Sequence, residues 1–293
     1  MQFLAYILVY PFLWLISILP FRLLYLFSDV LYVLLYHIIG YRKQVVNTNL
    51  KTVFPEKTDK EIAVIRKKFY KHLCDMFLEM AKTMSISETE LKKRFKIKNP
   101  QEFKRLEKLN KSIILIFGHY ASWEWSIVLQ NYISFKGLAV YKKLANKHFD
   151  TLVRNIRSKF NTKLINTKET INAISHYEVS GVRTITGFLS DQSPRLNKDA
   201  YWGEFMGIKV PCFTGAERLA KKLDFSTAYL KVTKVKRGFY EAEIMTLAEN
   251  PKEFENYKLT DMFLREVEKQ IYEAPEYYFW THKRWKHKGK SKL

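Results

Sequence analysis

The sequence predicts an α/β fold in which helices flank a mixed, largely parallel sheet, behind a hydrophobic N-terminal segment. Three observations lead to this prediction. The first 41 residues carry almost no charge, short apolar runs rich in β-branched residues begin at residue 112, and helical stretches separate those runs. A chain of 293 residues with 47% hydrophobic side chains can bury one large or two small cores, which excludes an intrinsically disordered protein.

Residues 1–41 form a hydrophobic segment whose only charges are Arg22 and Asp29. The segment lacks the basic start and the small-residue cleavage site of a secretory signal peptide. It is interrupted by Pro11 and Pro20, and a helix that spans a bilayer needs about 20 apolar residues. We therefore expect a membrane anchor, either one kinked membrane helix or a helical hairpin inserted in one leaflet. A buried helix of a soluble core is the alternative.

The charge of the chain lies outside this segment. There are 50 Lys and Arg residues against 29 Asp and Glu residues, a formal charge of +21 at pH 7, and residues 42–293 carry all of that excess. The body of the protein is therefore expected to face polyanions: lipid phosphates, an acidic protein or nucleic acid. Basic residues directly after the apolar segment favour the cytoplasmic side of the membrane. Nucleic-acid binding would not explain the hydrophobic segment, so we do not expect it.

Cys74 and Cys212 are the only cysteines, too few for a disulfide framework, and no Cys/His cluster indicates a zinc site. We expect two buried thiols, a reducing compartment, and no metal or bound cofactor.

Four regions follow one another along the chain: a hydrophobic anchor (1–41), a helical part packed on the core (42–110), an α/β core (111–281) and a basic C-terminal tail (282–293). In the helical part, Thr58 and Glu61 form a capping-box pattern before an amphipathic repeat. Further helices are expected at 45–55 and 88–95. In the α/β core, strands are predicted at 112–117, 138–141, 164–165, 183–189, 227–235 and 239–245, and helices at 123–132, 148–159, 169–176 and 213–223.

A candidate site follows the first predicted strand, where His119 lies in the turn and Glu124 in the first turn of the next helix. A carboxylate there can hold one imidazole nitrogen and leave the other as a general base. The alternatives are a loop histidine with satisfied hydrogen bonds and a glutamate favoured by the helix dipole.

The segment from Gly118 to Trp125 resembles the His-x4-(Asp/Glu) motif of glycerolipid-type acyltransferases. Its Gly-His-x-x-x-Trp-Glu form is similar to the late (secondary) acyltransferases of lipid A biosynthesis, the lauroyl- and myristoyl-transferring family. Other blocks of that family are matched in order along nearly the whole chain: Arg42 to Leu50 with Phe54-Pro55-Glu56, Tyr141 to Asn146, Arg154 to Lys159, Gly187 to Pro194, Phe205 to Gly215, and Tyr278 to Trp285. A single short motif is weak, whereas six blocks in order are specific.

The resemblance implies a direct acyl transfer. His119 would take the proton of an acceptor hydroxyl, which attacks an acyl thioester, and Glu124 would hold the imidazole. Arg157 is the candidate to stabilise the oxyanion, with a surface arginine as the alternative. Asp191 lies in the Asp-Gln segment after a predicted strand and would position Arg157 or the acceptor. The alternative is a structural role as a helix cap or in its loop. The apolar segment 201–210 is expected to be a loop that lines an acyl-chain groove or belongs to the core.

The implied partners are an acidic acyl carrier protein as donor, an anionic lipid A precursor as acceptor, and the inner-membrane surface, with the body on the cytoplasmic side. Two other functions remain open: a glycerophospholipid or aminolipid acyltransferase with the same dyad, and a non-enzymatic basic protein of the membrane surface. The Gly-Thr-Arg phosphate motif of many phospholipid enzymes is absent. A solvated tail without a specific partner is the alternative for residues 282–293.

Overall fold

The computed structural model of the protein describes residues 2–290. Its N-terminal part is helical. The elements in chain order are α1 (Gln2–Ile18), α2 (Phe21–Tyr32), the π-helix η1 (Val33–Ile39), α3 (Lys43–Val53), α4 (Asp59–Lys82) and α5 (Glu88–Arg94). The predicted capping box starts α4: the Glu61 backbone N–H donates to Thr58 Oγ1 (3.3 Å), and the Thr58 N–H donates to Glu61 Oε2 (2.8 Å).

A seven-stranded sheet forms the centre, in the order β1-β9-β8-β2-β5-β3-β4. All of its pairings are parallel except that of β8 with β9. Its strands are β1 (Phe95–Ile97), β2 (Ile113–Phe117), β3 (Lys136–Tyr141), β4 (Lys163–Asn166), β5 (Thr184–Leu189), β8 (Ser226–Lys236) and β9 (Phe239–Ala248). The predicted mixed, largely parallel α/β architecture is therefore confirmed. Every residue of β2 is buried, as expected of a central parallel strand.

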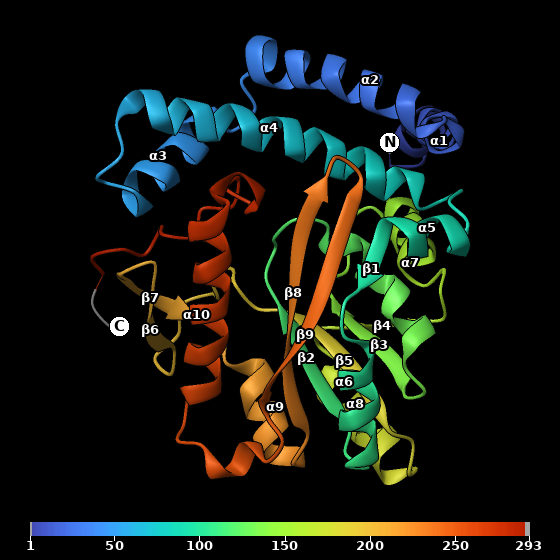
Figure 1. Cartoon of the computed structure of the whole chain (residues 1–293), viewed down its shortest axis with the longest axis vertical. Coiled ribbons are helices and arrows are strands. Elements are labelled where there is room, and N and C mark those ends of the chain that lie inside the picture. Colours follow the sequence, from blue (N-terminus) through green and yellow to red (C-terminus); the bar gives the residue numbers. More distant parts are fainter. Residues whose placement is uncertain (1, 291–293) are drawn as a thin grey trace.

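The elements that follow or connect the strands are α6 (Pro100–Lys108), the 3-10 helix η2 (Trp123–Tyr132), α7 (Lys147–Arg157), α8 (Thr170–Val179), α9 (Gly215–Leu223), η3 (Pro251–Glu253), α10 (Lys258–Glu273) and η4 (Pro275–Tyr277). Helices α9 and α10 pack on β2 and β8. In Figure 1, α4 crosses the end of the sheet toward which β8 points, and α2 lies along the outer side of α4.

The structure differs from the sequence-based expectations in two segments. Residues 201–212 form an antiparallel hairpin of β6 (Tyr201–Phe205) and β7 (Ile208–Cys212), where a loop was expected. Phe205 and Val210 are fully buried and Met206 nearly so, which assigns this segment to the core. The predicted basic tail packs on the same core as far as Trp285, with Arg284 fully buried. Its last residues, 291–293, lie outside the described residues.

The N-terminal segment holds one helical stretch, Phe21–Ile39, that is long and apolar enough to cross a membrane, and a shorter apolar helix, Tyr6–Ile18. Only one side of these helices meets the protein. Leu24 and Tyr36 are buried against α4 and its neighbours, whereas Leu26 and Ile38 are 62% and 74% exposed.

A buried carboxyl group lies where α2, α4 and β9 meet. Glu79 accepts hydrogen bonds from the Tyr25 and Tyr240 hydroxyls, both at 2.8 Å. Burial raises the pKa of Glu79 from 4.5 to about 7, against the opposing effect of the nearby Lys234 charge. The folded protein therefore retains this proton over a pH range in which the unfolded chain releases it.

Glu79 should make the protein less stable as the pH rises. Between pH 4.5 and about 7 the folded state binds more protons than the unfolded state at this residue, so its contribution to the free energy of unfolding falls by about 3 kcal/mol. Glu79→Gln should remove that fall, measured by urea unfolding in detergent across this range. Glu56→Gln, at a side chain that is 65% exposed, is the control. An unchanged slope in Glu79→Gln would contradict the assignment.

Candidate active site

The pairing of β2 with β5 brings two polar residues together at the carboxyl edge of the sheet. Phe117, the last residue of β2, is opposite Leu189, the last residue of β5. Two residues further along each chain lie His119 and Asp191. Their backbones therefore leave neighbouring parallel strands at the same level, which is where α/β proteins commonly place ligands.

Asp191 holds His119 through two contacts. Asp191 Oδ1 lies 2.6 Å from His119 Nδ1, and the His119 backbone N–H donates to Asp191 Oδ2 at 3.0 Å. A carboxylate at Nδ1 keeps the proton on that nitrogen and leaves the Nε2 lone pair available. Gln192 Nε2 lies 3.2 Å from His119 Nε2. The His119 side chain is 17% exposed and that of Asp191 only 1%, so the imidazole is accessible while its carboxylate partner is not.

The charge of Asp191 is maintained despite its burial. Burial by itself raises the pKa of Asp191, but the electrostatic attraction of His119 and the hydrogen bonds from its ring and backbone N–H outweigh it and lower the pKa below the usual range. A Cβ at Gly118 would lie 3.3 Å from a Val267 methyl group, which is a tight contact, so glycine at this position lets the turn pack closely on α10. The carboxylate is therefore ionised at neutral pH beside the imidazole.

The segment 277–279 holds the backbone of the His119 turn. The Ala121 N–H donates to the Tyr277 carbonyl (2.9 Å), and the Phe279 N–H donates to the His119 carbonyl (3.0 Å). Ala121 has a φ of 50°, which is uncommon for a residue with a Cβ and is typical of functional turns. The Phe279 ring stacks on the imidazole at 6.0 Å between centroids.

Glu124 lies in the first turn of η2 and forms a two-point ion pair with Arg157 at the end of α7. Arg157 Nε donates to Glu124 Oε2 (2.9 Å) and Nη2 donates to Oε1 (2.5 Å). The Glu124 side chain is 10% exposed and the Arg157 side chain is 29% exposed. Burial alone would lower the pKa of Arg157, but the charge of Glu124 raises it, so the guanidinium stays charged. Trp123 connects the two pairs: its ring lies 5.2 Å from the imidazole, and its Nε1–H donates to Glu124 Oε1 (3.2 Å).

The structure thus brings the four predicted site residues into one region but pairs them differently. Among the described residues, Glu124 makes no hydrogen bond to His119; Asp191 takes the place at the imidazole that was expected of Glu124. Arg157 is held by Glu124 and not by Asp191. The reason is geometric: Glu124 follows a tight turn into a 3-10 helix and meets the arginine of α7, while strand pairing delivers Asp191 to Nδ1.

His282 was not singled out from the sequence. Burial lowers its pKa to about 4, against the charge of the nearby Asp191, so it is neutral at pH 7. Asn49 on α3 donates to the His282 and Trp280 carbonyls (2.8 Å each) and thereby ties the segment beside the site to the helical part. A lone histidine in a basic segment offered no signal for this position.

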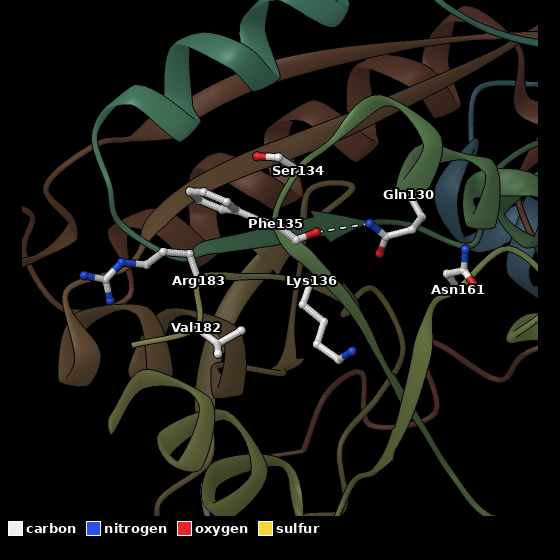
Figure 2. Close-up of a pocket in the computed structure, with 7 residues that line it drawn as sticks. All are labelled: Gln130, Ser134, Phe135, Lys136, Asn161, Val182 and Arg183. Carbon is white, nitrogen blue, oxygen red and sulfur yellow. Dashed lines mark hydrogen bonds between the residues drawn. The ribbon is translucent and has the colours of Figure 1, made fainter. Parts of the chain in front are cut away.

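Two cavities lie near opposite edges of the fold. One of about 370 Å³ is lined by α3 and the C-terminal segment, including Asn49, Lys283 and Lys286. The other, of about 410 Å³, lies where β3 and β5 begin, far along the strands from His119. Figure 2 shows its Lys136 and Arg183 extending in different directions, with Gln130 turned inward to the Phe135 carbonyl (3.0 Å). It holds no residue of the site. Within residues 2–290, no group of three or more His, Cys, Asp or Glu side chains is arranged to hold a metal ion.

Residues 1–287 match the protein family described as bacterial lipid A biosynthesis acyltransferase. The chain belongs to this family. A search of curated proteins gave no match. Lipid A biosynthesis acyltransferases are acyl-transferring enzymes associated with membranes, which agrees with the enzyme class predicted from the sequence and with the apolar helix of this chain. The earlier alternative of a non-enzymatic membrane protein is not favoured by this membership.

The Glu124–Arg157 pair should stabilise the fold as a unit. Arg157→Ala leaves a largely buried carboxylate unpaired and should lower the free energy of unfolding by about 2 kcal/mol. This is less than the loss on breaking a fully buried pair, because the Arg157 side chain is 29% exposed to water. The double variant with Glu124→Ala should recover part of this loss, measured by chemical unfolding as a double-mutant cycle. Additive losses in the cycle would show that the two side chains are not coupled.

Proposed function

We propose that the protein transfers a fatty acyl chain from an acyl thioester, carried by acyl carrier protein, to a hydroxyl of a lipid A precursor, with His119 as the general base. The observation that carries this proposal is the contact of Asp191 with His119 Nδ1, which keeps the proton on that nitrogen and makes Nε2, now 3.2 Å from the Gln192 amide nitrogen, the proton acceptor, in a chain of the lipid A acyltransferase family. The proposed catalytic pair is thus His119 with Asp191, in place of the His119–Glu124 pair expected from the motif.

The chemical step needs no covalent enzyme intermediate. His119 Nε2 takes the acceptor hydroxyl proton as the oxygen attacks the thioester carbonyl carbon. The tetrahedral oxyanion then collapses, the carbon–sulfur bond breaks, and the departing thiolate takes the proton from Nε2. Asp191 stays ionised and stabilises the imidazolium between these two transfers, as the carboxylate of a serine-protease triad does.

Arg157 is the proposed donor to the oxyanion. Glu124 binds its Nε and Nη2, and within the described chain Nη1 has no hydrogen-bond partner. A guanidinium held at two points in a partly buried site loses little freedom when it meets a developing charge, which is the condition for electrostatic stabilisation of a transition state. Glu124 is then a positioning residue that acts through Arg157.

The charge of the body supports both substrates. The acceptor is expected to carry phosphate and the carrier protein to be acidic, and the chain carries a formal +21. We place the acceptor's anionic headgroup in the cavity of about 370 Å³ lined by Lys283 and Lys286. The segment that borders the imidazole at Phe279 continues into the wall of this cavity. The proposed location is the cytoplasmic face of the inner membrane, where both substrates meet.

Variants of the two pairs should separate their roles. His119→Ala should abolish transfer, and Asp191→Asn should lower kcat by about 10³-fold, since a general base and its orienting carboxylate each contribute on this scale. Glu124→Gln should lower kcat less, by about 10-fold, because its effect passes through Arg157. The measurement is transfer of a radiolabelled acyl chain from acyl carrier protein in detergent-solubilised membranes.

Thermal unfolding of each variant provides the control for folding. Full activity in folded Asp191→Asn, together with a total loss in Glu124→Gln, would restore Glu124 as the partner of the imidazole. Lipid mass spectrometry of a deletion strain identifies the acceptor: a lipid A precursor short of one acyl chain is expected, whereas altered phospholipids with intact lipid A would overturn the acceptor assignment.

The lysine cavity should act on acceptor binding. The double variant Lys283→Gln, Lys286→Gln should raise the KM for a phosphorylated acceptor by about 30-fold with little change in kcat, because each lysine near a phosphate contributes about 1 kcal/mol. Lys288→Gln, at an exposed neighbouring position outside the cavity, is the matched control. An equal effect in both variants would assign the lysines to general charge attraction.

A further inference from the structure

Helices α1 and α2 meet at a bend at Leu19 and Pro20, and together with η1 they form a unit that we call the N-terminal hairpin. Polar contacts along its inner side join it to the body. Asp75 on α4 accepts from the Ser28 hydroxyl (2.7 Å) and from Arg237 Nη2 (2.7 Å), and Arg237 also donates to Asp29 (2.7 Å). The side chain of Asp75 is only 4% exposed. Asp29 on α2, whose side chain is 52% exposed, is thereby paired with a cation of the body.

A second set of contacts holds the bend between α1 and α2. Lys82 at the end of α4 donates to the Ser17 and Leu19 carbonyls, at 2.6 and 2.8 Å. The Arg94 guanidinium lies 3.3 Å from the centroid of the Phe21 ring. Lys82 thus satisfies backbone carbonyls that the bend leaves free, and Arg94 packs on the ring that follows the bend. The hairpin is therefore docked at both its bend and its centre.

The outer side of the same hairpin is apolar and exposed. Each of the following side chains is at least 40% exposed: Phe3, Leu4, Leu8, Phe12 and Leu15 on α1, and Leu23, Leu26, Phe27, Val30, Leu34 and Ile38 on α2 and η1. A contiguous apolar face of this size is unusual on a protein that meets only water. Basic residues flank it at Arg22, Arg42 and Lys43.

The hairpin lies at the same end of the molecule as the candidate active site. In Figure 1, α2 and α4 lie across the end of the sheet toward which β8 points, and β2, which leads to His119, runs parallel to β8. A surface that covers the outer side of α2 therefore lies at the end of the fold where the imidazole is.

We propose that the hairpin does not cross the membrane but lies flat in one leaflet of an anionic lipid bilayer, latched to the body by Asp75, Arg237 and Lys82. This proposal rests on the proposed function, in which the acceptor is an amphiphile of that leaflet, and it specifies how the enzyme reaches it. The apolar side of α1 and α2 enters the lipid, and the basic flanks meet lipid phosphates.

A spanning arrangement conflicts with these contacts. Phe21–Ile39 has sufficient length, but to cross the bilayer it would have to leave α4 and take Asp29 into the hydrocarbon. Its departure would also expose Leu24 and Tyr36 and leave Arg237 and Asp75 with fewer partners. Two copies joined through this face would place the flanking basic residues close to one another, which disfavours a second chain as the occupant.

Depth measurements distinguish the arrangements. Leu23 and Ile38 are 15 residues apart, or about 22 Å along a helix. Leu23→Cys and Ile38→Cys are each labelled with an environment-sensitive fluorophore in the full-length protein; the native Cys74 and Cys212 are buried. In phosphatidylethanolamine/phosphatidylglycerol vesicles, lipids spin-labelled near the headgroup and confined to the outer leaflet should quench both fluorophores equally. A helix that spans would give clearly unequal quenching and overturn the proposal.

Disulfide formation tests the latch in native membranes. Ser28→Cys with Asp75→Cys should cross-link on oxidation, so that after denaturation only the two native thiols react with a maleimide-polyethylene glycol tag. Ser28→Cys with Val179→Cys, where Val179 is 90% exposed on α8, is the control and should take four tags. Four tags in both variants would show that α2 has left α4 in the membrane.

A third experiment labels a single cysteine from the outer side of the membrane and does not depend on the folding of the double variant. Pro20→Cys, at the exposed bend, should resist a membrane-impermeant maleimide added to intact spheroplasts; labelling there would place the bend across the membrane and overturn the proposal. Oxidised dimers of Leu26→Cys would assign the apolar face to a second copy and overturn it as well. None of these readouts uses acyl transfer, so a failure of this proposal is distinguishable from a failure of the proposed function.

Discussion

The site depends on one pairing, that of β2 with β5. Its parallel register places Phe117 opposite Leu189, and the two chains then deliver His119 and Asp191 to the same point. A buried carboxylate is stable there only because the imidazole and a backbone N–H compensate its lost hydration. A slip of this register by one residue would direct the following side chains to opposite faces, so the contact of His119 with Asp191 is inseparable from the buried hydrophobic packing of the central strands.

The remaining contacts of the site hold elements that are distant in sequence. The segment 277–279 pairs with the turn that contains His119, and Asn49 holds the adjoining carbonyls of Trp280 and His282. The Glu124–Arg157 pair joins η2 to the end of α7. The motif after β2 therefore supplies a histidine and the anchor for an arginine, while the strand next to it leads to the carboxylate that holds the histidine.

The same logic governs the N-terminal hairpin. An apolar segment of 19 residues has the composition of a spanning helix, and hydropathy alone does not distinguish it from a helix that lies on a protein surface. The structure adds that Ser28 and Asp29 of this helix meet Asp75 on α4 and Arg237 in the turn between β8 and β9, and the proposed arrangement in one leaflet rests on these contacts. A helix with one side satisfied by protein and the other side apolar matches the two-sided environment of a membrane surface.

Periodicity, caps and ordered motifs are properties of neighbouring residues, so the α/β class, the central strands, the capping box at Thr58, the hydrophobic segment and the family could be predicted from the sequence. The sequence also placed His119, Glu124, Arg157 and Asp191 among the candidates. Which carboxylate meets the imidazole depended on the folded chain. That choice depends on strand order, and β2 and β5 are neighbours although two strands lie between them in the chain. The expectation for Glu124 followed sequence proximity, whereas the contact follows the hydrogen-bonded sheet.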